Sequence, residues 1–241
     1  MATERMLIWE GPSALTGEPI VVLATGVPKA SGRPSKAKAS NNAKTGDMIQ
    51  IAILTRDVNP TDAIKQGRDV DICGNCTHRS KASGGAGDCY THKNLRRGFA
   101  QTSTWRAHKA TGSAPFRIEA FAGKRVRFGS YGDPAAVPFE IWQAIASVAE
   151  AVTGYTHQWR TADPRFAELC MASADSVEDR REARLKGYRA FRVRLATEAR
   201  QTGEVVCPAS AEAGFKTTCS TCLSCGGTST GRRQDIVIVK H

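Results

Sequence analysis

The cysteines constrain this chain more than any other feature. Four of its eight cysteines lie near the C-terminal end, as Cys207, Cys219, Cys222 and Cys225. The last three are separated by two residues each, so their thiols can turn toward one point. Thiolates held this close need either disulfide partners or a metal, and the first interpretation is a metal.

A second cysteine group lies nearer the N-terminus, in a Gly- and Ser-rich loop over residues 71–92. It has the spacing Cys73-x2-Cys76-x12-Cys89-x2-His92. Cys170 stands alone in an apolar run and is predicted to be a core residue, because an isolated apolar cysteine usually packs as a small hydrophobe.

The composition indicates the kind of protein and the cellular compartment in which these cysteines are expected. The 241 residues are 41% hydrophobic, enough for one large α/β domain or two small ones. No apolar run approaches the roughly 20 residues of a membrane helix, and the first residues do not read as a signal peptide. We therefore expect a cytoplasmic protein without a membrane partner, in which clustered thiols favour metal or redox chemistry over disulfides.

The charge indicates an anionic partner. A net charge of +11 and a pI near 9.5 make nucleic acid or a nucleotide the expected partner. Residues 29–46 are basic with small polar companions, and they read either as a phosphate-contacting loop or as a solvated mobile loop. Within them Lys44, Thr45 and Gly46 resemble part of a phosphate-binding loop without its full glycine spacing, and together with Gly132 they are the candidate cofactor-binding residues.

Basic and aromatic residues also alternate over residues 79–109. Tyr90, Phe99 and Trp105 are interspersed among the basic side chains. This pattern suits a surface that tracks a nucleic-acid backbone and stacks bases, but it is equally expected of aromatic core residues flanked by solvated charges.

Strand and helix patterns alternate along most of the chain. Apolar runs predict strands over residues 20–25, 48–54, 124–131, 155–159, 167–173, 188–195, 204–207 and 235–239. Helical patterns follow at 139–152 and 176–186, and a shorter one ends at Gly67. The alternation predicts an α/β fold with mainly parallel strands and covering helices.

The simplest division of the chain has three parts. Residues 1–47 form an N-terminal strand and basic loop, and residues 48–206 form the main domain with the cysteine loop 71–92. Residues 207–241 form a cysteine-rich C-terminal extension that completes the same domain.

Several predicted strands end in polar residues. Ligands gather at the carboxyl ends of parallel strands, so these residues are candidates to line one catalytic cavity: Asp133, His157, Gln158, Ser173 and Asp175. Each also has a structural explanation. Asp133 precedes a proline as turn formers do, Asp175 stands at a helix start, and a lone histidine is often a hydrogen-bonded core residue.

The cysteine spacings leave the metal open between iron–sulfur and zinc. Cys-x2-Cys-x2-Cys with a distant fourth cysteine is the spacing style of [4Fe–4S] sites, whereas structural zinc more often uses two separated Cys-x2-Cys pairs. In the N-terminal group, three cysteines would leave one iron of a cluster open, whereas adding His92 would complete a Cys3His zinc site.

The chain resembles a family of phage-encoded, cysteine-rich proteins. The resemblance covers about residue 40 to the end and rests on these motifs: SNNAKTGDMIQ, CGNCTHR, GDCY, RFGSYGDPAAVP, GYTHQWR, CMASADS, GYRAFRV and TTCSTCLSCGG. More distantly, the RFGSYGDP strand, the helix after it and the YTHQW strand are similar to phage proteins with a degenerate radical-SAM-like barrel.

This second resemblance implies a partial (β/α) barrel with cysteine-rich metal-binding loops, an iron–sulfur cluster and S-adenosylmethionine as a further cofactor. The location it implies is the host cytoplasm. The chain departs from the radical SAM signature, because Cys73, Cys76 and Cys89 do not follow the Cys-x3-Cys-x2-Cys spacing.

Two functional hypotheses follow from the sequence. In one, the chain is a radical-SAM-like iron–sulfur enzyme that modifies a nucleic acid or nucleotide, and both cysteine groups hold clusters. In the other, both groups are structural zinc sites of a replication-associated nucleic-acid-binding protein without catalytic activity.

Overall fold

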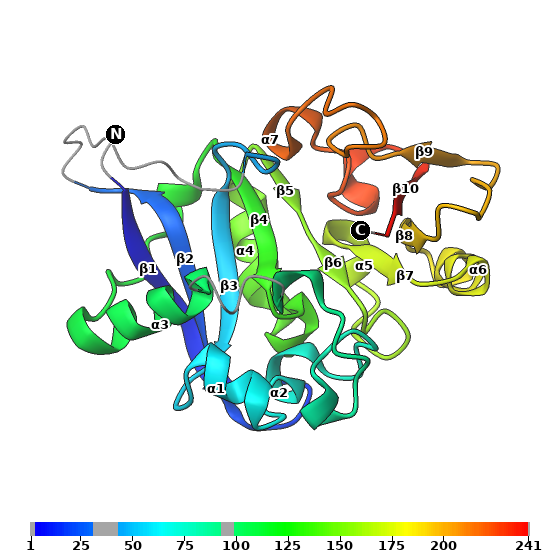
Figure 1. Cartoon of the computed structure of the whole chain (residues 1–241). Helices are drawn as coiled ribbons and strands as arrows, with labels where there is room; N and C mark the ends of the chain where they lie inside the picture. The colour runs from blue at the N-terminus through cyan, green and yellow to red at the C-terminus, as the bar shows by residue number, and fades with distance from the viewer. Residues whose placement is uncertain (1–2, 31–42, 93–98, 241) are drawn as a thin grey trace.

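Two five-stranded sheets lie side by side in the computed structural model, which describes residues 3–30, 43–92 and 99–240 (Figure 1). The first sheet has the order β1-β2-β3-β4-β5, with strands Thr3–Pro12, Pro19–Pro28, Ile49–Thr55, Arg125–Tyr131 and Ala151–Thr153. The second has the order β6-β7-β8-β10-β9, with strands Tyr155–Thr156, Met171–Ala174, Ala190–Arg194, Asp235–Val239 and Glu204–Val206.

Most of the strand pairs are parallel. β1, β2 and β3 pair antiparallel, and each later neighbour pair, from β3–β4 to β10–β9, is parallel. β10 lies between β8 and β9, so the C-terminal cysteine-rich segment completes the second sheet. The predicted α/β fold with mainly parallel strands is thereby confirmed at the level of two mostly parallel sheets.

Gly154 joins the two sheets. It is the single residue between β5 and β6, its N–H donates to the Cys225 carbonyl at 3.1 Å, and its own carbonyl accepts from the Met171 N–H at 2.9 Å. A Cβ at this position would stand 2.7 Å from Cys170 Sγ, so only glycine fits without a shift.

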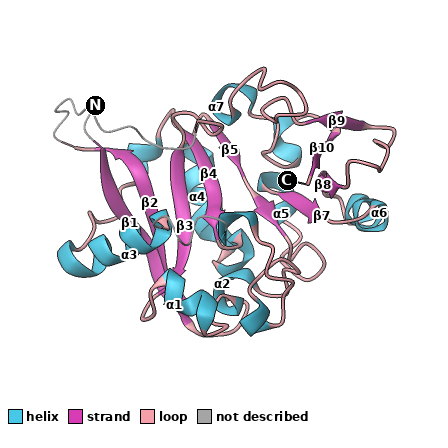
Figure 2. Ribbon diagram, in the orientation of Figure 1, coloured by secondary structure: helices cyan, strands magenta, loops and turns pink. Residues whose placement is uncertain are grey.

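Helices surround the sheets (Figure 2). They are α1 Pro60–Lys65, α2 Val70–Cys73, α3 Ala100–Thr111, α4 Phe139–Val148, α5 Phe166–Leu169, α6 Val177–Leu185 and α7 Cys219–Cys222. Short 3-10 turns occur at Lys81–Ser83, Ile118–Phe121, Pro134–Ala136 and Thr228–Thr230. Helices α4, α5 and α6 each connect two successive parallel strands, which need a crossover connection of this kind.

Local sequence explains where the connecting helix α6 begins. Ser176 Oγ accepts the Asp179 N–H at 2.9 Å, which satisfies one of the free N–H groups of the first turn. The predicted start of this helix is confirmed, and its last residue lies one position before the predicted end.

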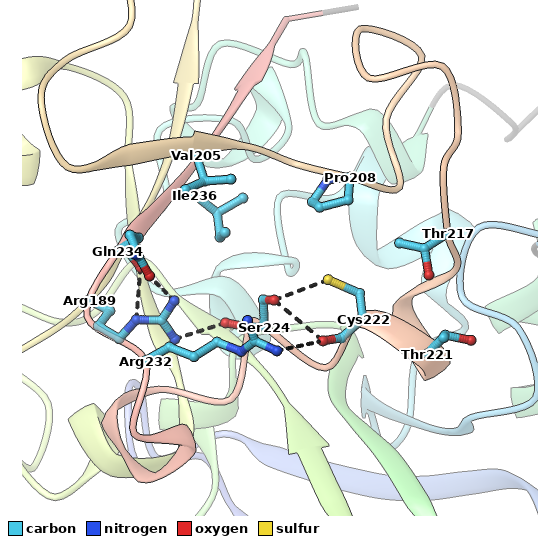
Figure 3. Close-up of a pocket in the computed structure, with 10 residues that line it drawn as sticks. All are labelled: Arg189, Val205, Pro208, Thr217, Thr221, Cys222, Ser224, Arg232, Gln234 and Ile236. Carbon is cyan, nitrogen blue, oxygen red and sulfur yellow. Dashed lines mark hydrogen bonds between the residues drawn. The ribbon is translucent and has the colours of Figure 1, made fainter.

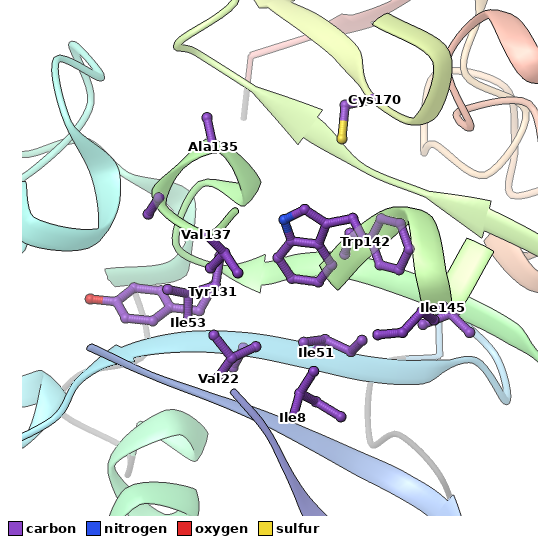
Figure 4. Close-up of a cluster of buried hydrophobic side chains, with 14 of the residues drawn as sticks. Ile8, Val22, Ile51, Ile53, Tyr131, Ala135, Val137, Trp142, Ile145 and Cys170 are labelled. Carbon is purple, nitrogen blue, oxygen red and sulfur yellow. The ribbon is translucent and has the colours of Figure 1, made fainter. Parts of the chain in front are cut away.

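The main core lies between the first sheet and α4. Trp142 is fully buried, its indole N–H donates to the Pro134 carbonyl at 2.8 Å, and its ring packs 4.7 Å from the Phe128 ring. Figure 4 shows this indole among the aliphatic side chains of the core, with Ile51 of β3 nearby. Cys170 is fully buried in the same core, as predicted.

Several predicted elements differ from the observed ones. The apolar run 167–173 splits into helix α5 and strand β7, because a short apolar run fits a buried helix turn as well as a strand. The helix predicted over 139–152 ends at Val148, and its last apolar residue, Val152, belongs to β5. The strand predicted over 155–159 is paired only at Tyr155–Thr156.

Two further differences concern the N-terminal part of the chain. Strand β1 was not predicted, although its alternating Met6 and Ile8 are buried as on the inner face of a half-exposed strand. Most of the basic loop predicted over 29–46 lies outside the described residues. Within the described ranges, none of the helices has the length and apolar character that crossing a membrane requires.

Candidate functional site

One cavity of about 320 Å³ lies against a single face of the parallel strands. Alternate residues face it, as the period of two in a strand dictates. These are Tyr155 of β6, Ser173 of β7, Phe191 and Val193 of β8, and Ile236 and Ile238 of β10, and the pattern continues just past β6 and β7 with His157 and Asp175. The intervening Ala172, Ala190 and Arg192 are buried, and α6 packs against β7 and β8.

Both cysteine groups line this cavity. Cys73, Cys76 and Cys89 contribute from the loop at residues 71–92, and Cys207, Cys219, Cys222 and Cys225 contribute from the C-terminal segment. Asp133, His157, Asp175 and Cys207 all lie just past the carboxyl ends of parallel strands, where α/β folds place their ligand sites. Segments far apart in the sequence therefore meet at one concave surface.

Burial favours the protonated form of three of the cavity thiols. Burial raises the pKa of Cys73 well above its ordinary value, and burial likewise raises the pKa of Cys76 and of Cys225 to about 12. All eight cysteines of the chain are free. A bound metal would replace these protons, because thiolates are the ligating form.

Donor spacing distinguishes a cluster from a single zinc ion. Among the described residues, neither cysteine group brings three donor atoms within 4.8 Å of one another. A tetrahedral zinc ion with Zn–S bonds of about 2.3 Å needs its sulfurs roughly 3.8 Å apart. An iron–sulfur cluster binds each thiolate at a different iron and so accepts wider spacing. Within the described residues neither cysteine group is therefore a preformed zinc site, and zinc would require the side chains to approach one another.

Helix α7 positions two of the C-terminal cysteines, and the 44–46 segment holds its start. The Lys44 carbonyl accepts the Cys219 N–H at 2.8 Å, and the Thr45 carbonyl accepts the Ser220 N–H at 3.2 Å. Gly46 has φ of 69°, and a Cβ there would lie 2.2 Å from Ser220 Oγ. Lys44 and Thr45 also line the cavity, so their cofactor-binding role stays a prediction alongside this packing role.

Gly132, the other predicted cofactor-binding residue, also borders the cavity. Its φ is 78°, and an added Cβ would lie 2.8 Å from the Ile53 Cβ. The glycine thus permits the chain to turn sharply between β4 and Asp133.

Arg189 holds the loop that carries Cys222 and Cys225. Its buried guanidinium donates to the Ser224 carbonyl at 2.8 Å, the Gly227 carbonyl at 3.0 Å and the Gln234 carbonyl at 2.6 Å. Arg189 also lines a second pocket of about 300 Å³, which Figure 3 shows with its lining residues. Because its guanidinium donates to these backbone carbonyls, Arg189 fixes the conformation of the loop that carries the cysteines.

Some of the predicted catalytic residues only line the cavity, and others also hold neighbouring backbone in place. Asp133 lines the cavity, yet its Oδ2 accepts the His157 N–H at 2.7 Å and its Oδ1 accepts the Ala135 N–H at 3.0 Å. Burial raises the pKa of Asp133 in spite of these bonds. Ser173, His157 and Asp175 reach the cavity directly.

Gln158 does not face the cavity. It follows His157 in the chain, so its side chain lies on the other side of the backbone, where it is buried. Its Nε2 donates to the Cys73 carbonyl at 2.9 Å, and its Oε1 accepts the Asn75 N–H at 3.4 Å. In the structure Gln158 thus helps to position the first cysteine loop, and its catalytic role stays a prediction.

His92 is not brought together with the three cysteines that precede it. It is not among the residues that border the cavity, and its ring packs 6.4 Å from the Phe99 ring and 6.2 Å from the Tyr131 ring. Its Nε2 is buried without a hydrogen-bond partner among the described residues. The geometry gives no preformed Cys3His arrangement within the described part of the chain.

Sequence reasoning missed His78, a cavity side chain whose two ring nitrogens both contact carboxylates. Its Nε2 lies 2.9 Å from Asp175 Oδ1, and its Nδ1 lies 2.7 Å from Asp88 Oδ1. The bond to Asp175 is the main cause that raises the pKa of His78 to about 9. Burial opposes ionisation of Asp175, but the bond from His78 prevails and lowers the pKa of Asp175 to about 2. The sequence feature that could have identified His78 is its position two residues after Cys76.

A cation and two tyrosines form another part of the wall. Arg127 Nη2 donates to the Tyr90 hydroxyl at 3.2 Å, and its guanidinium lies 5.4 Å from the centre of the Tyr155 ring. Of the three aromatics predicted for base stacking, only Tyr90 is exposed, at 61%. Phe99 is buried in the core, and the Trp105 indole N–H donates to the Thr55 carbonyl at 3.0 Å, so the core interpretation holds for these two.

The chain was compared with family models, curated proteins and solved structures, and none of the three comparisons gave a significant match.

Proposed function

We propose that the chain is an iron–sulfur protein whose cluster is bound inside a catalytic cavity. The observation that carries this proposal is that seven cysteines from two distant segments border one cavity at the carboxyl ends of parallel strands. We further propose that the two sheets, joined at Gly154, form a partial (β/α) barrel around it, as in radical-SAM-like proteins.

The C-terminal group is the better cluster site of the two. Cys207, Cys219, Cys222 and Cys225 would supply four thiolates, one for each iron of a [4Fe–4S] cluster. Their loop is fixed by Arg189 and by the joint at Gly154, which favours a rigid site.

The N-terminal group would leave one iron of a second cluster without a protein ligand. Cys73, Cys76 and Cys89 provide three thiolates on the same cavity. An open iron is what binding of S-adenosylmethionine requires, and the cluster would supply the electron for that chemistry. The residues of the chain itself would bind and orient the reactants and exclude water, with Ser173 and Asp175 on the wall toward them.

A nucleotide, or one base of a nucleic acid, is the substrate class that we favour. The cavity is near the lower end of the about 300–1,000 Å³ usual for small-molecule sites, so it suits a nucleotide better than a duplex. Arg127 between Tyr90 and Tyr155 offers a cation and aromatic rings together, a combination that suits a base or a phosphate.

Anaerobic purification tests the proposal. We expect a brown protein with iron and acid-labile sulfide in equal amounts, and we expect Cys219→Ser with Cys222→Ser to lose much of both. Cys170→Ala is the matched control, since Cys170 lies in the core and outside both groups, and it should retain iron and sulfide. A change in the electron paramagnetic resonance spectrum of the reduced cluster on adding S-adenosylmethionine would test the open iron.

A colourless protein with stoichiometric zinc would refute the cluster. Together with DNA binding that weakens steeply as salt increases, it would favour a zinc-stabilised nucleic-acid-binding protein instead.

A further inference from the structure

Three side chains of the cavity wall bring metal-ligating atoms together without any cysteine. One ligand atom each from His78, His157 and Asp175 lies within 4.8 Å of the other two. The three residues come from the loop after Cys76 and from positions just past the ends of β6 and β7. Separate parts of the fold thus converge on this point.

The outer contacts of His78 are those of a metal-bound histidine. Its Nε2 lies 2.9 Å from Asp175 Oδ1, and its Nδ1 lies 2.7 Å from Asp88 Oδ1. Histidine ligands commonly donate their second nitrogen to a carboxylate, which fixes the ring orientation. Asp88 is in turn held by Lys240, whose Nζ donates to its Oδ2 at 2.7 Å.

His157 offers an unused donor atom to the same point. Neither ring nitrogen has a hydrogen-bond partner in the described part of the chain, although the ring borders the cavity and lies 5.7 Å from the His78 ring. Its backbone is fixed independently, because its N–H donates to Asp133 at 2.7 Å. The third ligand, Asp175, is oriented by Thr77, whose hydroxyl donates to Oδ2 at 2.9 Å and leaves Oδ1 toward the histidines.

We propose that His78, His157 and Asp175 bind one divalent first-row metal ion, separate from any metal held by the cysteines. Two imidazoles and one carboxylate suit Mn²⁺, Fe²⁺ or Zn²⁺, and three protein ligands leave coordination positions open to water or substrate in the cavity. The inference does not rest on the proposed cluster, since it uses none of the seven cysteines.

Mn²⁺ is the probe that separates this site from the thiolates, because oxygen and imidazole ligands suit it and soft thiolates do not. The full-length protein is titrated with Mn²⁺, and the free ion is followed by its electron paramagnetic resonance signal. We expect one Mn²⁺ per chain, at least tenfold weaker binding in Asp175→Asn and in His157→Ala, and about 10–100-fold weaker binding in Asp88→Asn.

Two controls accompany the titration. Glu182→Gln changes a half-exposed carboxylate of the neighbouring helix α6, and Cys219→Ser with Cys222→Ser changes the other metal group. Both should bind Mn²⁺ as the unmodified chain does. Circular dichroism establishes that each variant is folded, and iron and sulfide contents unaffected in Asp175→Asn would keep this site distinct from the cluster.

Pulsed electron paramagnetic resonance supplies a second readout on the unmodified protein. Hyperfine couplings from two histidine nitrogens to the bound Mn²⁺ are expected. The inference is overturned if no Mn²⁺ binds, if binding is unchanged in both Asp175→Asn and His157→Ala, or if bound Mn²⁺ shows no nitrogen coupling. In those cases the three side chains form only an ion-paired wall of the cavity.

Discussion

The joint between the two sheets gives the sharpest test of the packing. In Gly154→Ala the added methyl would lie 2.7 Å from Cys170 Sγ, on the order of 1 Å inside a normal contact of about 3.5–4.0 Å. Overpacking of this kind costs about 1–3 kcal/mol in the free energy of unfolding. The φ of Gly154 is outside the left-handed region, so the cost comes from crowding rather than from backbone strain.

Cys170→Ala should relieve the crowding. Alone it removes one buried atom and should cost about 0.5–1.5 kcal/mol, as does the loss of a buried methyl group. In the double variant the new methyl fills the space that Sγ leaves, so the double variant should be more stable than Gly154→Ala alone. The predicted coupling energy between the two substitutions is about 1–3 kcal/mol.

Urea denaturation of the four proteins measures this coupling. Gly154→Ala should also bind less metal than the unmodified chain, because the Gly154 N–H holds the Cys225 carbonyl at 3.1 Å. Additive destabilisation by the two substitutions, with no rescue in the double variant, would contradict the proposed contact between Gly154 and Cys170.

Three further substitutions test other contacts. Arg189→Met should destabilise the protein by at least about 2 kcal/mol in urea and lower its metal content, because five bonds from a buried guanidinium are lost near Cys225. Glu204→Ala leaves the fully buried Arg192 side chain without its partner at 2.6 Å and should cost about 3–5 kcal/mol, whereas replacing both by apolar residues should recover most of the stability in the same assay. Trp142→Phe removes the donor to a buried carbonyl and should lower stability by about 1–3 kcal/mol, and a thermal midpoint equal to that of the unmodified chain would contradict this.

Most strands could be located in the sequence because buried strands appear as runs of apolar residues. β3 and β10 lie within one residue of their predicted bounds, since continuous apolar runs mark strands buried on both faces. Helix α5 was missed because a short, mostly apolar segment fits a helix turn or a strand equally well. Joining of the two sheets at Gly154 was not predictable, because it depends on what packs against that residue in three dimensions.

The location of the candidate site at the strand ends was predictable from the sequence, but the full set of its residues was not. Strand-end position identified His157, Ser173 and Asp175 as cavity residues, because parallel strands end at one edge. It did not separate Gln158 from these residues, because the partners that bury Gln158, at Cys73 and Asn75, lie on a distant segment of the chain. His78 was overlooked because its partners, Asp88 and Asp175, lie on other segments and become neighbours only in the folded chain.

The two cysteine groups lie on either side of the long segment 90–206, and this arrangement governs when the site can form during folding. Contacts between distant segments form slowly, because the chain loses the entropy of closing the long loop before the new contacts stabilise it. Until then the cysteines are exposed thiols that can be oxidised to mispaired disulfides. A metal that binds only the finished cavity would draw the chain toward the native state by mass action. Refolding yield should therefore depend on the order in which reductant and metal are supplied.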